Sequence, residues 1–211
     1  MKRFAFAISL LVAVPAMAQE VLTFGQSTTT PAVTGTEAGG VTTIMATAAP
    51  ITVTSCFACP PTIDTLTLKA VSTGPVAVFQ GFEVQSFKGT FSIMAGTTDI
   101  LSGTFTDATF GAGTSLVLSA SNHVPGETLM LTSGVIPPRD LAGQLAMSLS
   151  LAIAPIVGVQ ENSIAPFTGS IAGTFSSSAA SIPEPSTFAL LLMGLGTYAT
   201  AAVARFRRRR D

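Results

Sequence analysis

The side chains best suited to chemistry in this chain are two cysteines and a single histidine. Cys56 and Cys59 are separated by two residues and are followed at once by two prolines. A redox-active Cys-x-x-Cys pair usually opens a helix, whose N-terminus stabilises the thiolate, whereas the alternating residues on both sides of this pair predict strands. We therefore expect a small-loop disulfide between Cys56 and Cys59, and no metal site, because no second pair of ligands accompanies them.

The single histidine lies in no recognisable catalytic motif. His123 lies in the turn-rich segment Asn122–Glu127, and the chain contains no nucleophile elbow, zinc-protease helix motif or phosphate-binding loop. The acidic residues are isolated from one another along the chain, so local spacing indicates no calcium site. The sequence predicts no catalytic residue and no cofactor. The alternative is a secreted hydrolase in which the fold brings His123 to a serine and an acid.

The most specific pattern is at the C-terminus, where three short segments follow one another. Pro183, Glu184, Pro185 and Ser186 form an extended stub, because each proline fixes φ and removes a backbone donor. Residues 188–204 are apolar and, as one helix, just span a hydrocarbon core of about 30 Å. The basic residues that follow are a stop-transfer block and predict a cytoplasmic C-terminus: Arg205, Arg207, Arg208, Arg209 and Arg210.

This three-part tail resembles the PEP-CTERM sorting signal of Gram-negative bacteria, which is the substrate of membrane proteases called exosortases. The resemblance covers about residues 182–211 and nothing upstream. It implies that an exosortase recognises Pro183, Glu184 and Pro185 at the outer face of the inner membrane and cuts near them. The upstream part then passes to the cell surface. By the same resemblance, such proteins accompany exopolysaccharide production and biofilm formation.

The N-terminus carries the features of a secretory signal peptide. Lys2 and Arg3 precede an apolar core over residues 4–14, and Ala16 and Ala18 form a small-residue cleavage signature. The apolar core is too short to span a membrane. We expect cleavage after Ala18, so that the exported chain begins at Gln19, in an oxidising compartment that favours the disulfide.

Most positive charge lies in these two end segments. Residues 19–182 contain three basic and nine acidic residues, a net charge of −6. Nucleic acids and anionic lipids require a basic surface to meet their phosphates. The body is therefore not expected to bind nucleic acid, and the terminal arginines are interpreted as a topology signal.

Alternation of apolar and polar residues dominates the body and predicts strands with one buried face. It is clearest over residues 145–153 and 167–175, and it recurs at 65–70, 88–94 and 100–106. Frequent Gly and Pro turns and scant helical periodicity favour an all-β antiparallel sandwich or barrel. In the segment after residue 81 we place Glu83 and Gln85 on the wet face, and residues 107–113 are interpreted as a turn.

The domain boundaries follow from these patterns. Residues 19–50 are rich in Thr, Ala and Gly and poor in bulky side chains, which predicts a loosely structured arm. The tripeptide Gly-Thr-Phe occurs at residues 89, 103 and 173 without a regular period, so we interpret it as a strand-packing pattern and not as a repeat. The predicted organisation is a signal peptide over 1–18, an arm over 19–50, a β-domain over 51–176, a linker over 177–182 and the sorting signal over 183–211.

The sequence thus predicts an exported, non-enzymatic protein of the cell surface or extracellular matrix. Its expected partners are an exosortase, the inner membrane before processing, and exopolysaccharide. A first alternative is a structural or adhesive envelope protein that stays anchored through residues 188–204. The second is the secreted hydrolase with His123.

Overall fold

The computed structural model describes residues 19–56, 59, 63–79, 82–111, 115–153 and 157–178. Apart from one short 3-10 turn, every element in these ranges is a β-strand, which confirms the predicted all-β class. The predicted signal peptide and the sorting signal, including the helix expected over 188–204, lie outside the described residues. Within the described part of the chain, no helix has the length and apolar character needed to cross a bilayer.

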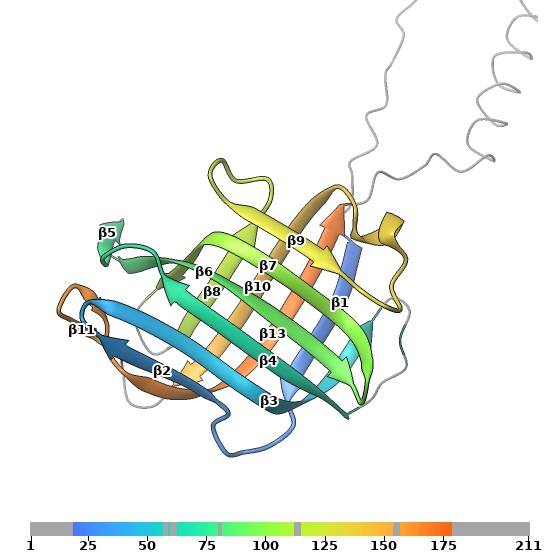
Figure 1. Cartoon of the computed structure of the whole chain (residues 1–211), viewed down its shortest axis with the longest axis horizontal. Coiled ribbons are helices and arrows are strands. Elements are labelled where there is room, and N and C mark those ends of the chain that lie inside the picture. Colours follow the sequence, from blue (N-terminus) through green and yellow to red (C-terminus); the bar gives the residue numbers. More distant parts are fainter. Residues whose placement is uncertain are drawn as a thin grey trace, which may run out of the picture. The chain divides into compact units, whose positions relative to one another are not determined.

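Eight strands of the described chain close into an antiparallel barrel (Figure 1). Their order is β6-β4-β3-β1-β13-β10-β8-β7, and β7 returns to pair with β6. Of the two predicted architectures, the barrel is therefore the one that forms. The bounds are β1 Gln19–Gln26, β3 Val41–Cys56, β4 Ile63–Ser72, β6 Phe82–Ala95, β7 Thr98–Gly111, β8 Ser115–Ser121, β10 Gln144–Ile153 and β13 Phe167–Ser178.

Three positions around the barrel are each filled by two strands in succession. β2 (Val33–Ala38) continues the position of β1, since both pair with β3 and β13. In the same way β5 (Ala77–Phe79) follows β4 along β6, and β9 (Thr128–Thr132) follows β8 along β7. The remaining elements are the 3-10 turn η1 (Pro138–Leu141) and a small hairpin of β11 (Val159–Gln160) and β12 (Ser163–Ile164).

The break between β1 and β2 is held by two backbone hydrogen bonds, from Ser27 to Pro50 and from Ala32 to Gly169, and by the side chain of Gln26. Nε2 of Gln26 donates to the carbonyl oxygens of Thr28 and Thr30 at 2.8 and 2.7 Å, and Oε1 of Gln26 accepts from the backbone N–H of Ile171 at 3.3 Å. The amide therefore bonds to backbone on both sides of the break, where strand pairing stops.

The predicted loose arm over residues 19–50 is wrong, because these residues form β1, β2 and most of β3. A scarcity of bulky side chains does not prevent a segment from forming strands, because backbone pairing with neighbouring strands can order it. The segment has few apolar side chains, but those it has, such as Phe24, Val33 and Ile44, point inward and are almost fully buried, and the Thr-rich outer positions suit a pleated surface. The folded domain is accordingly residues 19–178, not 51–176.

Two further boundaries differ from the sequence prediction. The turn expected over 107–113 is wrong over its first part, since β7 continues to Gly111. Asp107 has φ of 57° and marks a bulge where the register with β6 shifts, and the extra residue keeps the apolar positions facing inward. The predicted linker is shorter than expected, because residues 177 and 178 still belong to β13.

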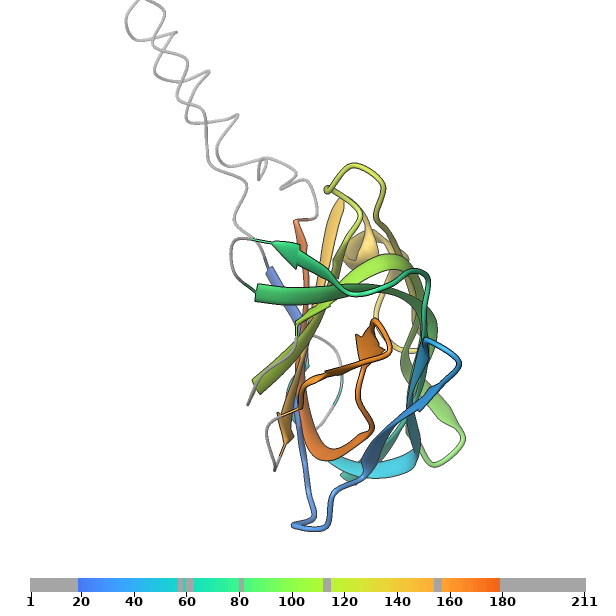
Figure 2. The same cartoon turned by 90° about the vertical axis from the view of Figure 1, so that its left-hand side faces the viewer.

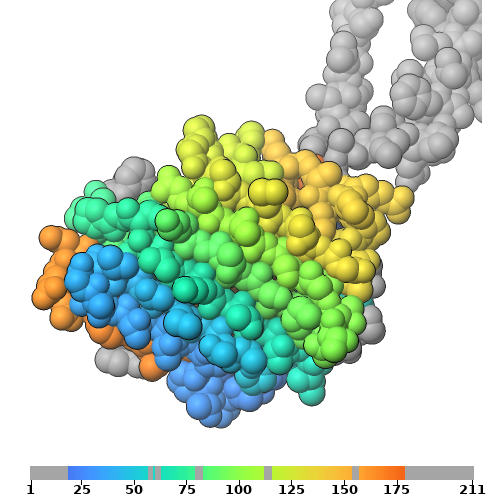
Figure 3. All heavy atoms as spheres, viewed as in Figure 1, coloured from blue at the N-terminus to red at the C-terminus, as the bar shows by residue number. Residues whose placement is uncertain are grey.

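Phenylalanine rings fill the interior. Phe91 and Phe175 stack with ring centroids 4.7 Å apart, and Phe24 lies 6.4 Å from Phe175. A second group, nearer the start of β13, joins Phe110 to Phe167 at 5.9 Å and to Phe87 at 5.4 Å. An eight-stranded barrel is just wide enough for its own side chains to fill it, and here they do. Figure 3 shows the outer wall of β3, β4, β6 and β7 as a continuous packed surface.

The repeated Gly-Thr-Phe tripeptides explain how these rings fit. In the β6–β7 pair, Gly89 lies opposite Phe105 and Phe91 lies opposite Gly103, so each glycine leaves room for the ring of the facing strand. The third copy repeats the arrangement, since Gly173 lies opposite Phe24 of β1. The interpretation as a strand-packing pattern is confirmed.

Candidate functional site

The first and last strands of the barrel lie side by side at one end of it. Gln19, the first residue of β1, is in register with Ser177 of β13. β13 also pairs with the whole length of β10, from Gly169 to Ser178. The barrel therefore completes its hydrogen bonding at Ser178, and we call the end that holds Gln19, Cys56, Gln144 and Ser178 the terminal end.

The residues predicted to direct sorting and export lie outside the described part of the chain. These are the motif residues Pro183, Glu184, Pro185 and Ser186, the stop-transfer residues Arg205 and Arg207–Arg210, and the cleavage signature Ala16 and Ala18. Residues 179–182 alone separate the last barrel strand from the motif.

Cys56 and Cys59 are bonded to each other, with Cα atoms 5.4 Å apart. The disulfide follows β3 directly and lies at the terminal end, where Cys56 is in register with Leu22 of β1. It therefore ties the last residue of β3 to Cys59, beside the first strand of the barrel.

His123 lies in the exposed loop between β8 and β9. Its Nδ1 is 3.1 Å from the amide nitrogen of Gln144. The nearest hydroxyl in sequence, on Ser121, donates to the carbonyl oxygen of Leu145 at 3.0 Å and accepts from the backbone N–H of His123. The His123 ring thus contacts Gln144, and the Ser121 hydroxyl bonds to backbone groups of the turn and not to the His123 ring.

At the opposite end, a hairpin of residues 157–166 lies across the mouth of the barrel (Figure 2). We call it the plug hairpin. Its residues Ser163 and Ile164 are fully buried, and its turn has positive φ at Glu161 and Asn162. Positive φ at both central residues is the geometry of a tight two-residue hairpin turn.

Four buried polar side chains connect the plug hairpin to the wall, and we call them the polar latch: Thr42, Ser72, Gln85 and Ser163. The Thr42 hydroxyl is 2.7 Å from the Ser163 hydroxyl and donates to the Ile164 carbonyl oxygen at 2.9 Å, while the Thr42 N–H donates to Ser72 Oγ at 3.0 Å. Gln85 accepts from the Ile164 N–H at 3.2 Å and donates to Ser163 Oγ at 3.1 Å and to the Gly74 carbonyl oxygen at 2.8 Å. The side chains of the latch thus provide the hydrogen bonds to the backbone N–H and carbonyl oxygen of Ile164 that a neighbouring strand would otherwise provide.

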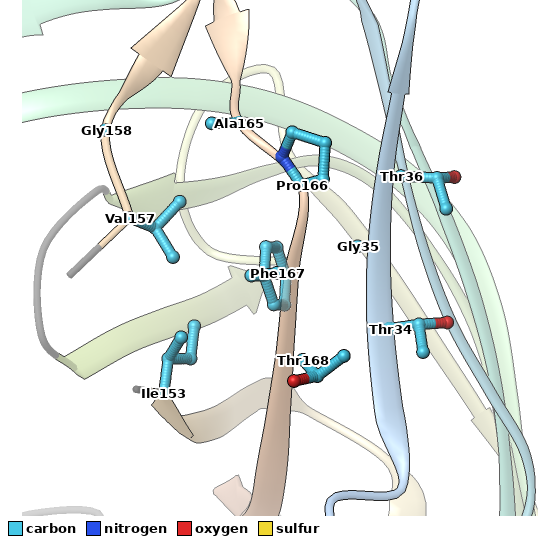
Figure 4. Close-up of a pocket in the computed structure, with 10 residues that line it drawn as sticks. All are labelled: Thr34, Gly35, Thr36, Ile153, Val157, Gly158, Ala165, Pro166, Phe167 and Thr168. Atoms are coloured by element: carbon cyan, nitrogen blue, oxygen red, sulfur yellow. The ribbon is translucent and has the colours of Figure 1, made fainter. Parts of the chain in front are cut away.

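Shallow hollows lie on either side of the plug hairpin. One of about 470 Å³ is bounded by Phe167, Val157 and Ile153, and Figure 4 shows the side chains of Thr34 and Thr36 on the far side of β2 from Val157. The other, about 370 Å³, is lined by Val41, Pro75 and Glu161 among others. Among the described residues, no three His, Cys, Asp or Glu side chains gather closely enough to hold a metal ion.

The wall of β13, β10 and β8 is uncharged, since none of the three strands contains Asp, Glu, Lys or Arg. Its outward side chains are mostly hydroxyls in register across the strands. One row of five joins five strands, and we call it the hydroxyl row: Thr23, Thr174, Ser148, Ser119 and Thr109. Neighbouring strands are about 4.8 Å apart, so the row sets hydroxyls at that spacing.

Comparison with known proteins gives one match. Residues 181–210 match the model of the PEP-CTERM protein-sorting motif. The chain carries a PEP-CTERM sorting signal. No curated protein and no solved structure matches the chain.

The PEP-CTERM match confirms the resemblance seen in the C-terminal residues. The signal marks the chain as an exosortase target exported to the cell envelope. It covers the predicted motif, apolar segment and arginine block, and it ends one residue before the C-terminus.

Sequence reasoning missed the polar latch. The sequence pattern places Gln85 on the wet face of its strand, which is wrong, since its side chain points inward and is 1% exposed. The phase of the alternation in β6 is set by Phe87 and Phe91, which lie on the same face as Gln85. Counting back from these two phenylalanines could have identified the glutamine as a buried, hydrogen-bonded residue.

Proposed function

We propose that this protein is an exported β-barrel delivered to the cell surface or extracellular matrix by exosortase processing. The leader over residues 1–18 directs export, the segment 188–204 holds the chain in the inner membrane, and the enzyme cuts near Pro183–Pro185. The PEP-CTERM match carries this proposal. The protein acts as a substrate in it, with no catalytic role of its own.

The barrel supports the proposal because all of its strands lie upstream of the sorting motif. β13 is hydrogen-bonded on both sides and ends at Ser178, before the motif begins. A cut near Pro183 therefore removes no residue of the barrel, and the released product keeps its whole core. The disulfide between Cys56 and Cys59 suits an oxidising compartment outside the cytoplasm.

The test is a Glu184→Ala change in the full-length gene. Glutamate is the charged residue of the motif, and a charge-assisted hydrogen bond contributes about 1.5–3 kcal/mol. We expect release of the processed protein to fall by roughly tenfold or more. The measurement is the intact mass of the protein in the surface and membrane fractions, with and without a functional exosortase.

Glu20→Ala is the matched control, because Glu20 is an exposed glutamate on β1. It should be processed like the unchanged chain, giving a product that begins at Gln19 and ends near Pro183–Ser186. A mass that includes Arg205–Asp211 in every strain would contradict processing, and would favour an envelope protein anchored permanently through residues 188–204.

For the partner of the barrel at its destination we propose a neutral polysaccharide of the matrix. The uncharged wall carries the hydroxyl row, whereas the exposed side chains of Glu83, Lys69 and Lys88 lie on the β4–β6 side. Hydroxyls can both donate and accept hydrogen bonds to sugar hydroxyls, and an uncharged wall leaves no ion to be desolvated in the contact.

We expect Ser148→Glu to weaken co-sedimentation with the purified neutral polysaccharide of the host by roughly tenfold, because it places a charge in the centre of the row. Thr67→Glu, on the exposed face of β4, should leave it unchanged. Equal retention of the two variants, or no co-sedimentation of the unchanged protein, would refute this partner.

A further inference from the structure

One oxygen of a largely buried carboxylate at the terminal end has no hydrogen-bond partner in the part of the chain that the structure describes. Oδ2 of Asp140, in η1, is shielded from solvent and makes no hydrogen bond among the described residues. The side chain as a whole is 16% exposed. Leaving a buried acceptor unpaired is costly, and for a charged group the cost is larger still.

The one cation within 4 Å of this carboxylate in the described chain is a poor partner. Nε of Arg139 lies 3.7 Å from Oδ2, which is too long for a hydrogen bond. The Arg139 side chain is 81% exposed, so water competes for it and the pair contributes little. Asp140 therefore retains capacity for a second, closer cation.

The position of Asp140 indicates where that cation would come from. The backbone carbonyl oxygen of Asp140 accepts a hydrogen bond of 2.6 Å from Oγ of Ser177, and Ser177 is in register with Gln19. η1 and the first residue of β1 therefore share the buried Ser177 as a neighbour. Figure 1 shows η1 at the same end of the barrel as the start of β1 and the end of β13.

Leader removal changes the chemistry at this point. Before cleavage the nitrogen of Gln19 is a neutral amide. Hydrolysis of the bond between Ala18 and Gln19 consumes one water and leaves a carboxylate on Ala18 and an α-amine on Gln19, which takes up a proton and is cationic at neutral pH.

We propose that the α-ammonium group created at Gln19 by leader removal pairs with the buried carboxylate of Asp140. The pairing gives the unpartnered oxygen a charged donor and ties β1 to η1 across the end of β13. The mature barrel is therefore more stable than the same barrel with its leader attached. This inference rests on the leader-removal step of the proposed function and is independent of exosortase processing.

The test compares two chains that are both expressed with the leader and both lose it. One has the natural sequence, and the other has Gly-Ser-Gly-Ser inserted between Ala18 and Gln19. The insertion keeps the leader and its cleavage site, and it moves the new ammonium up to about 13 Å along the chain. Asp140→Asn should lower the folding equilibrium constant about tenfold in the mature chain and less than about twofold in the inserted chain. Asp107→Asn, at the exposed bulge, is the control and should act equally on both.

A second measurement does not depend on whether Asp140→Asn folds. The α-amine of the mature chain should react more slowly with an acylating reagent at neutral pH than that of the inserted chain, because an ion-paired ammonium is protected. Equal effects of Asp140→Asn in both chains, or equal amine reactivity, would overturn the pairing. The mass of the N-terminal peptide gives a further check. A peptide that does not start at Gln19 would also overturn the pairing. So would one lighter by one ammonia, because cyclisation of Gln19 removes the cation. Each of these results leaves processing at Glu184 unaffected.

Discussion

Replacing Gly89 with alanine should lower the free energy of unfolding by about 3 kcal/mol, at the upper end of the cost of overfilling a packed core. A Cβ atom at this position would lie 2.7 Å from Cζ of Phe105 and 2.9 Å from Cα of Ala70, and closer still to the carbonyl oxygen of Lys69. Two of these three atoms belong to the backbone of β4, so relief requires the β4–β6 pair to separate. The measurement is urea denaturation followed by far-ultraviolet circular dichroism, since the chain has no tryptophan.

Gly25 supplies the matched control. It lies in β1, has no positive φ, and an added Cβ would meet no atom within 4 Å. Gly25→Ala should therefore be neutral or stabilise by about 0.5 kcal/mol, through the reduced entropy of the unfolded chain. If both alanines shifted the urea midpoint by the same amount, the glycine–phenylalanine packing of the barrel would not be the reason for glycine at residue 89.

Gln85→Leu should be comparably destabilising, by about 3 kcal/mol. Leucine removes the three hydrogen bonds of the Gln85 amide and leaves the N–H of Ile164 and the carbonyl oxygen of Gly74 without these partners. Leucine is similar in size to glutamine, so the packed volume of the core hardly changes. The loss of unfolding free energy therefore measures the hydrogen bonds of the polar latch. The N–H of Ile164 should also exchange with solvent faster, which nuclear magnetic resonance can follow directly.

Gln160→Leu tests whether the effect is specific to the latch. Gln160 belongs to the same plug hairpin, in β11, and its side chain is exposed. The control should change the free energy of unfolding by less than about 0.5 kcal/mol. An unchanged exchange rate at Ile164 in Gln85→Leu would show that the plug hairpin is held by its apolar contacts and not by the latch.

Strands in which large and small side chains alternate could be predicted from the sequence. In β10, Leu145 to Leu151 alternate with exposed Ala and Ser residues, as expected from the pattern. In residues 19–50 the apolar side chains are few, and their burial comes from strand pairing, since β1 and β2 each pair with both β3 and β13. That pairing joins residues far apart in the chain, so local composition could not reveal it.

Among the candidate sites, too, those formed by consecutive residues could be predicted from the sequence and those formed by distant residues could not. The sorting signal is linear, and its recognition needs only the order of proline, apolar and arginine segments, so the sequence sufficed. The polar latch and the contact between Ser177 and Asp140 join residues that are 30 to 122 positions apart. No local spacing reports such contacts, because they depend on which strands become neighbours when the barrel closes.

The register between Gln19 and Ser177 has a consequence for how this protein is assembled from parts. A module whose two ends emerge from adjacent positions in one sheet can be fused at both ends, or circularly permuted, without stretching its backbone. The barrel therefore keeps every strand pairing whatever sequence is joined to it before Gln19 or after Ser178, and such sequences could be exchanged without rebuilding the sheet.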